Sequence, residues 1–124
     1  MLPARHRLTD RADFAATIRG RGARRHGSRL LVVHARVADA TQTDVRGDSS
    51  PRVGLVVSKA VGNAVIRTRV KRRLRAQAAP LLASLPAGAD LVVRANPAAA
   101  QATSDELGAA LRHCLRHLLV GDGR

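Results

Sequence analysis

Apolar residues recur along this chain with two different periods, and the periods separate strands from helices. Three short apolar runs, at residues 30–37, 52–58 and 90–95, are rich in Val and Leu and are bounded by polar or Gly-containing segments, as is typical of buried strands. In the second run Val53, Leu55 and Val57 alternate with other residues and so share one face. We expect that face to lie on the core.

Three other segments carry apolar residues at helical spacing. The first covers residues 10–19, with Thr9 as a plausible N-cap, Gly20 at its end, and Phe14 and Ile18 one turn apart. The second follows the Gly-Asn pair at 62–63 and continues to about residue 79, next to Pro80. Its apolar stripe comprises Ile66, Val70, Leu74 and Leu81.

The third helix is predicted by a capping box, in which Thr103 is followed three residues later by Glu106. We expect it to run to about residue 120. Its apolar face comprises Leu107, Leu111, Cys114, Leu115 and Leu118. Cys114 is therefore expected to be a small buried apolar residue, and as the lone cysteine it can form no internal disulfide.

The order helix, strand, strand, helix, strand, helix predicts one α+β domain over residues 1–124, with a small mixed sheet and about three helices in a two-layer sandwich. The strand-helix-strand unit from residue 52 to 95 implies a parallel pair. Residues 1–8 form a short basic arm, residues 20–28 a Gly- and Arg-rich loop, and residues 39–51 a flexible polar loop. Such loop tracts leave room for a hairpin and a fourth strand.

Charge adds the first indication of function. Twenty-two Lys and Arg residues face nine acids, for a net charge of +13, and a field of this sign attracts polyanions. We find no run of about 18 apolar residues that would span a membrane, and no apolar leader at the N-terminus. We therefore expect a cytoplasmic protein with no membrane partner.

The positive charge is concentrated on the second helix. Residues 49–89 contain no acid, and six cations fall within the nine residues from 67 to 75. A solvated helix face usually mixes signs, because like charges four residues apart repel each other. The cations surround most of the helix, which suits a concave folded RNA. The cations expected to contact RNA are Lys59, Arg67, Arg69, Lys71, Arg72, Arg73 and Arg75. Asn63 at the helix start is either a plain N-cap or an RNA contact.

The segment Arg52-Val-Gly-Leu-Val-Val-Ser-Lys59, together with the residues from Val61 through Ile66-Arg-Thr-Arg-Val-Lys-Arg-Arg-Leu-Arg75, resembles the signature of the bacterial ribonuclease P protein family. Weaker similarity flanks it at residues 7–20 and 91–97, so the resemblance covers roughly residues 5–119. It implies a left-handed crossover at the basic helix. It also implies two partners, a catalytic RNA and the precursor tRNA whose 5′ leader is removed.

The resemblance also implies roles for particular residues. Arg67, Thr68 and Arg69 match an Arg-Asn-Arg element of the family, in which Thr68 stands where Asn is usual. A cleft formed by the first helix and the sheet binds the leader in the family. The residues that correspond to it are Phe14, Ile18, His34 and Arg94. Phe14 has a second interpretation as the one large aromatic residue of the core.

No catalytic residue is expected in this chain, because its acids form no paired arrangement near the basic helix. No metal site is expected either. His113 and His117 are spaced by one turn, but they point away from the apolar face, and no carboxylate or further cysteine is spaced to complete a site. We therefore expect no tightly bound cofactor, with Mg²⁺ required by the ribonucleoprotein and held mainly by RNA.

Two other classes of function share the charge. A structural RNA-binding protein of the ribosomal type would have the basic residues but not the long motif. A DNA-binding helix-turn-helix module needs a helix shortly before Ile66, where the sequence predicts a strand instead. We therefore expect no DNA partner.

Overall fold

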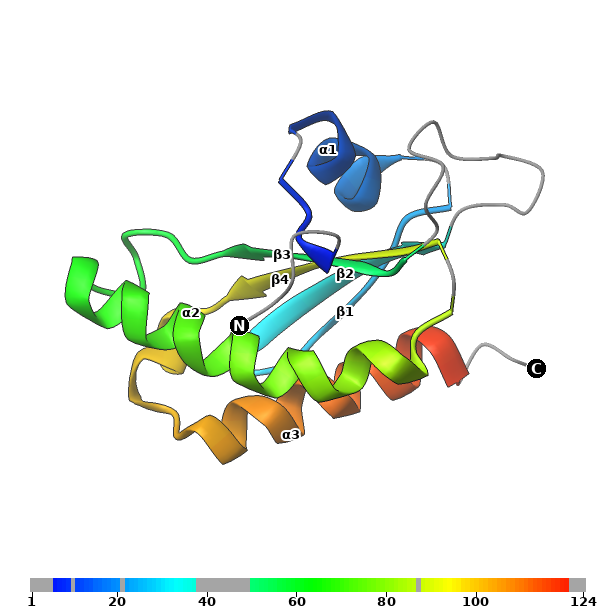
Figure 1. Ribbon diagram of the computed structural model, residues 1–124. Helices are drawn as coiled ribbons and strands as arrows, with labels where there is room; N and C mark the ends of the chain where they lie inside the picture. Colours follow the sequence, from blue (N-terminus) through cyan, green and yellow to red (C-terminus); the bar gives the residue numbers. More distant parts are fainter. Residues whose placement is uncertain (1–5, 10, 21, 38–49, 87, 121–124) are drawn as a thin grey trace.

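The computed structural model describes residues 6–9, 11–20, 22–37, 50–86 and 88–120. One mixed sheet separates helix α1 on one face from helices α2 and α3 on the other (Figure 1). The strands are β1 (Arg24–Gly27), β2 (Leu31–Val37), β3 (Arg52–Val56) and β4 (Ala89–Ala95), in the spatial order β1-β2-β4-β3. The predicted α+β class, with a mixed sheet and three helices, is confirmed. The prediction of two layers is wrong, because α1 packs on the opposite face of the sheet and adds a third layer.

Strand β3, helix α2 and strand β4 form the predicted strand-helix-strand unit, since β3 and β4 pair in parallel. The other two pairs, β1 with β2 and β2 with β4, are antiparallel. Strand β3 is therefore one edge of the sheet, and β1 is the other.

The helices begin where side chains cap them. Helix α2 spans Ala64–Ala78, and α3 spans Ser104–Leu115 behind the predicted capping box, in which Thr103 and Glu106 each accept a hydrogen bond from the other's backbone N–H. Helix α1 spans Arg11–Arg19. Three short helical turns adjoin these helices. The 3₁₀ turn η2 (Ala79–Ser84) follows α2, the 3₁₀ turn η3 (Pro97–Gln101) precedes α3, and the π-helical turn η4 (Arg116–Val120) follows α3.

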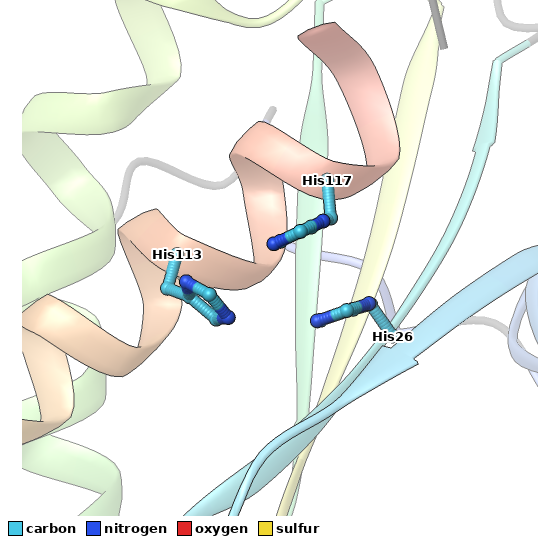
Figure 2. Close-up of side chains that lie close together, drawn as sticks. All are labelled: His26, His113 and His117. Carbon is cyan, nitrogen blue, oxygen red and sulfur yellow. The ribbon is translucent and has the colours of Figure 1, made fainter. Parts of the chain in front are cut away.

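Strand β1 corrects the prediction of a loop at residues 20–28. Its sequence, Arg-Arg-His-Gly, has no apolar alternation. As an edge strand it is held by backbone pairing with β2 and does not need such a pattern. This strand brings His26 beside His113 and His117 of the last helix (Figure 2). The polar segment at 39–51 lies mostly outside the described residues.

The core lies between the sheet and the pair α2 and α3. The fully buried side chains include Leu31 and Val33 of β2, Leu91 and Val93 of β4, Val70 and Leu74 of α2, and Leu107 and Leu111 of α3. Each such side chain contributes about 1.5–3 kcal/mol by leaving water. Cys114 is buried among them as predicted, and burial raises the pKa of its thiol. Within the described part of the chain, no helix is both long and apolar enough to cross a membrane.

The strand register assigns every other side chain to the opposite face. Because Leu31 and Val33 point into the core, Val32, His34 and Arg36 point toward the side covered by α1. The cross-strand partners on that face are also polar in part, since Arg36 lies opposite Asp90 and Val32 opposite Arg94. The sheet therefore has one apolar face and one face with charged groups.

Candidate nucleic-acid interface

The basic helix α2 begins at an N-cap. The Asn63 side chain accepts a hydrogen bond from the Ile66 backbone N–H at 3.0 Å, which is the capping role considered for it. No acidic residue lies in the first turn of α2. The positive end of the helix is thus left without a carboxylate of its own. Contact between Asn63 and RNA stays a prediction.

Most of the predicted RNA-contacting side chains are on the surface. Thr68 is exposed, and so are four cations, which are Lys59, Arg69, Arg72 and Arg75. Arg67 and Lys71 are half-buried, and Arg67 donates from Nε to the Gly62 carbonyl at 3.2 Å. Arg69, Arg72 and Arg75 make no hydrogen bond or ion pair with any described residue. Their donors therefore face solvent and are available to a phosphate.

Arg73 has a structural role that the sequence did not predict. Its Nη1 donates to the Ala102 carbonyl at 2.6 Å, on the side of α2 that faces α3. The side chain is half-buried and braces α2 against the turn that precedes α3. We therefore leave Arg73 out of the interface.

A groove of about 620 Å³ lies beside α2, between that helix, β3 and the N-terminal segment with α1. The described residues that line it are Arg7, Leu8, Thr9, Phe14, Val53, Gly54, Leu55, Thr68, Lys71, Arg72, Arg75 and Ala76. Four of these are cations and none is acidic. The groove combines positive charge with an apolar floor, as single-stranded nucleic acid requires for its phosphates and its bases.

The N-terminal segment reaches the groove by pairing with the edge strand β3. Leu8 donates its N–H to the Val53 carbonyl at 3.0 Å, and Arg7 forms an isolated parallel bridge with Val53. The Leu8 side chain is buried. This pairing holds Arg7 and Thr9 at the rim of the groove. The sequence predicted a basic arm here but gave no indication that it would contact β3.

Phe14 lies in the groove and not in the buried core. It is half-buried, and its ring lies on the backbone of Gly54. A Cβ atom added to Gly54 would collide with Cζ and Cε1 of Phe14, so any other residue here would displace the ring. The interpretation of Phe14 as a core residue is therefore wrong. Its contact with the leader stays a prediction.

The structure places all four residues of the predicted leader cleft on or facing the α1 side of the sheet. Phe14 and Ile18 come from α1 and are half-buried, and Arg94 is exposed on β4. His34 is 5% exposed, and neither ring nitrogen has a hydrogen-bond partner among the described residues. Burial, followed by the charges of Arg94 and Arg25, lowers the pKa of His34. This side chain is therefore neutral at pH 7.

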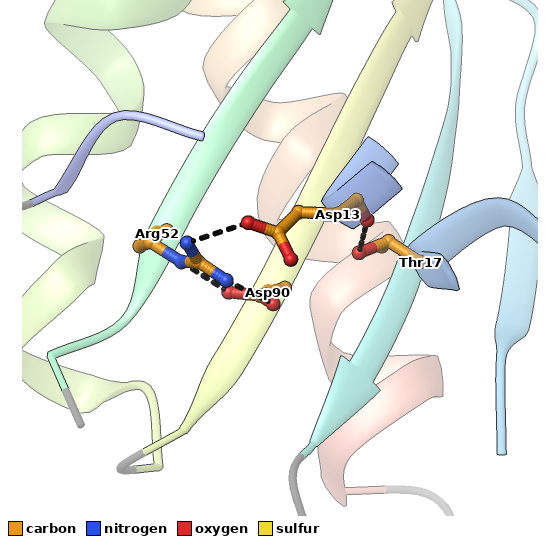
Figure 3. A network of polar contacts seen from close by, with 4 residues as sticks. All are labelled: Asp13, Thr17, Arg52 and Asp90. Carbon is orange, nitrogen blue, oxygen red and sulfur yellow. Dashed lines mark hydrogen bonds and ion pairs between the residues drawn. The ribbon is translucent and has the colours of Figure 1, made fainter. Parts of the chain in front are cut away.

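Arg52 fastens α1 to the sheet (Figure 3). Its Nε and Nη2 donate to the two carboxylate oxygens of Asp90 at 2.9 and 2.8 Å, and its Nη1 donates to Asp13 of α1 at 3.0 Å. The hydrogen bonds to Asp90 raise the pKa of Arg52 despite its burial. Thr17 of α1, whose hydroxyl donates to the Asp13 carbonyl, is fully buried beside this network. Arg52 belongs to the acid-free segment of the sequence, but its charge is neutralised within the fold.

The chain is similar to known proteins over nearly its whole length. A model of the family described as Ribonuclease P matches residues 2–119. The chain is 51% identical to the ribonuclease P protein component of Streptomyces griseus, with all of both chains covered, and 49% identical to that of Nocardia farcinica, with 99% of this chain and 86% of the relative covered. Its structure is similar to that of the Staphylococcus aureus RNase P protein, with a TM-score of 0.75, 26% identity, and 93% and 96% of the two chains covered.

Proposed function

The chain belongs to the ribonuclease P protein family, and on this premise we propose that it helps a catalytic RNA to remove the 5′ leader of precursor tRNA in the cytoplasm. As a ribonuclease P protein component it is the partner of the ribonuclease P RNA in a ribonuclease complex. A ribosomal-type structural role is not favoured, because the family model covers nearly the whole chain.

The observation that carries the proposal is the groove beside α2, whose described lining residues include four cations and no acid. Lys71, Arg72 and Arg75 line it from the helix, and Arg7 lines it from the N-terminal segment. Like charges this close together repel each other, and a bound phosphate backbone offsets that repulsion. We assign the exposed arginines of α2, which are Arg69, Arg72 and Arg75, to the catalytic RNA.

The leader of precursor tRNA is single-stranded, so its bases are free to stack. Phe14 offers a ring face at the groove, and Ile18 extends the apolar surface one turn further along α1. Stacking of a base on an aromatic ring contributes about 1–3 kcal/mol. Arg94 is exposed on the same face of the sheet and is placed to pair with a leader phosphate. In this proposal the protein recognises the part of the substrate that mature tRNA lacks.

Hydrolysis itself is assigned to the RNA. Mg²⁺ in proteins is bound through carboxylates, and none is found among the described residues that line the groove. Asp13 of α1 and Asp90 of β4 are both paired with Arg52. These residues do not fit a Mg²⁺ site, so the ions that the reaction needs would be bound by RNA. The protein would lower the Mg²⁺ requirement by neutralising phosphates.

The test compares the affinities of the catalytic RNA for precursor and mature tRNA, with and without this chain. We expect the chain to strengthen binding of precursor tRNA by at least about 5-fold, which is the lower end of what one stacked base contributes, and to leave mature tRNA binding nearly unchanged. Equal strengthening of both would show that the chain adds only charge and does not contact the leader.

A further inference from the structure

Three histidines from two ends of the chain meet at the edge of the sheet (Figure 2). His26 lies on β1, while His113 lies on α3 and His117 on the turn η4 that follows it. One ring nitrogen of each lies within 4.8 Å of one ring nitrogen of each of the others. His113 and His117 are exposed and His26 is half-buried, so solvent reaches the cluster. The third member of the cluster is a histidine distant in the sequence, whereas only a carboxylate or a further cysteine was considered from sequence as a partner of the His113–His117 pair.

The fold determines that these side chains face one another. His26 lies opposite Val33 in the antiparallel pair of β1 with β2, and opposite residues share a face of the sheet. Val33 points into the core toward α3, so His26 points the same way. Arg24, two residues earlier on that face, donates from Nη1 to the Leu118 carbonyl at 2.9 Å. This bond fixes the edge strand against η4.

The chemistry of the cluster is that of a transition-metal site. Three imidazoles from three elements, with the fourth position open to water, are a ligand set typical of Zn²⁺. Imidazole also suits Cu²⁺ and Ni²⁺, whereas Mg²⁺ and Ca²⁺ need oxygen ligands, which the cluster does not offer.

Closing the cluster on an ion requires only side-chain rotation. Nitrogens bound at 2.0–2.1 Å in a tetrahedral site lie about 3.3–3.4 Å apart, which is shorter than the present 4.8 Å limit. The rings of His26 and His117 are stacked, with centroids 4.2 Å apart and planes at 6°. Because a metal lies in the plane of each ring that binds it, one of these two rings must turn. The terminal torsion of histidine is soft, and the rings are accessible, so the rotation meets little resistance.

We propose that His26, His113 and His117 form a site for a late first-row divalent cation of the Zn²⁺ class, which would clamp the edge strand β1 to the C-terminal helix. The site lies on the helix α3 side of the sheet, away from the groove between α1, β3 and α2. It neither uses the groove residues nor depends on the function proposed for them.

The positive net charge of the chain opposes any cation. Coordination by imidazole must therefore supply the affinity, and the site should discriminate strongly between Zn²⁺ and Mg²⁺. If the three histidines did not coordinate the ion, the chain would bind neither Zn²⁺ nor Mg²⁺ measurably, and no discrimination between them would be seen.

The experiment uses the full chain without an affinity tag. Zn²⁺ binding is measured by calorimetry, Co²⁺ binding by visible absorption, and unfolding temperature with and without Zn²⁺. The variants are His26→Gln, His113→Gln and His117→Gln, and the matched control is His6→Gln, whose imidazole contacts the Pro51 carbonyl elsewhere in the fold.

We expect one Zn²⁺ per chain, a tetrahedral or five-coordinate Co²⁺ spectrum, and a higher unfolding temperature with Zn²⁺. When the free Zn²⁺ concentration is 100 times the dissociation constant, the equilibrium constant for folding should be on the order of 100-fold larger than without Zn²⁺. Each cluster variant should weaken Zn²⁺ binding by more than about tenfold, because even substitution of residues that only hydrogen-bond to a metal ligand commonly weakens binding by that factor. The control should bind as the native chain does.

Circular dichroism of the three variants shows whether each is folded. Because His113 and His117 are exposed, we expect the His113→Gln and His117→Gln variants to fold normally. Native-like Zn²⁺ affinity in folded His113→Gln and His117→Gln would overturn the site. So would an equal loss in His6→Gln, or the absence of Zn²⁺ binding by the native chain.

Discussion

Removing two groove arginines tests whether α2 is an RNA-binding helix. Arg72 and Arg75 are exposed, line the groove and have no partner among the described residues. Each phosphate that the protein no longer neutralises should reduce the slope of log K against log salt by about 0.7 for single strands to about 0.9 for duplex. The double variant Arg72→Ala with Arg75→Ala should therefore reduce the slope by about 1.4–1.8. The assay is binding to the ribonuclease P RNA over a monovalent-salt series at fixed Mg²⁺.

The matched control removes the same charge from a different surface. Arg73→Ala with Arg112→Ala deletes one arginine that is bonded to the Ala102 carbonyl and one that is exposed on α3. We expect its salt slope to change much less, and its stability to fall by about 1 kcal/mol because the hydrogen bond of half-exposed Arg73 is removed. Equal reductions in slope for the two double variants would refute the reasoning, because net charge alone would then account for binding.

Three further predictions concern the α1 face. Phe14→Leu should weaken precursor tRNA binding in the assembled complex by about 1–3 kcal/mol and leave binding of the catalytic RNA unchanged, with unchanged precursor affinity as the contrary result. Arg52→Met should destabilise the fold by about 3–5 kcal/mol in denaturant unfolding, because it leaves buried Asp90 unpaired; adding Asp90→Asn should recover much of that stability, and no recovery would contradict the pairing. Because the folded pKa of His34 is lowered from 6.5, stability should fall as pH drops below about 6.5, where the unfolded state binds the proton more readily. His34→Leu should make that decline smaller, and an identical pH profile would exclude His34 as a cause.

The sequence predicted those elements that carry their own local information. The capping box at Thr103 and Glu106 and the apolar stripe of α3 set that helix correctly. The strand-helix-strand unit likewise followed from its alternating and helical periods.

What escaped prediction depends on neighbours distant in the chain. Strand β1 has no apolar pattern, since its pairing comes from the backbone of β2. Without β1 nothing in the sequence placed His26 beside the histidines of the last helix. The same holds for Arg73, which looks like any other cation of α2 until the fold brings Ala102 within 2.6 Å of it.

The position of Phe14 shows how a single small residue resolves an ambiguity. From sequence, the single Phe of the chain could be assigned either to the leader cleft, which the family resemblance favoured, or to the core. Gly54 on β3 provides the space in which the ring lies on the sheet, beside α2 and outside the main core. That pairing joins residues far apart in the chain, and no local pattern encodes it.

The central claim is that this chain assists a catalytic RNA and performs no hydrolysis itself. The most direct measurement is cleavage of precursor tRNA by the protein alone, by the ribonuclease P RNA alone and by both together, at a Mg²⁺ concentration too low for the RNA alone. We predict cleavage at the mature 5′ end only when both are present, and none by the protein at any Mg²⁺ concentration. Site-specific cleavage by RNA-free protein that is abolished by Asp13→Asn would contradict this account and assign the chemistry to the chain.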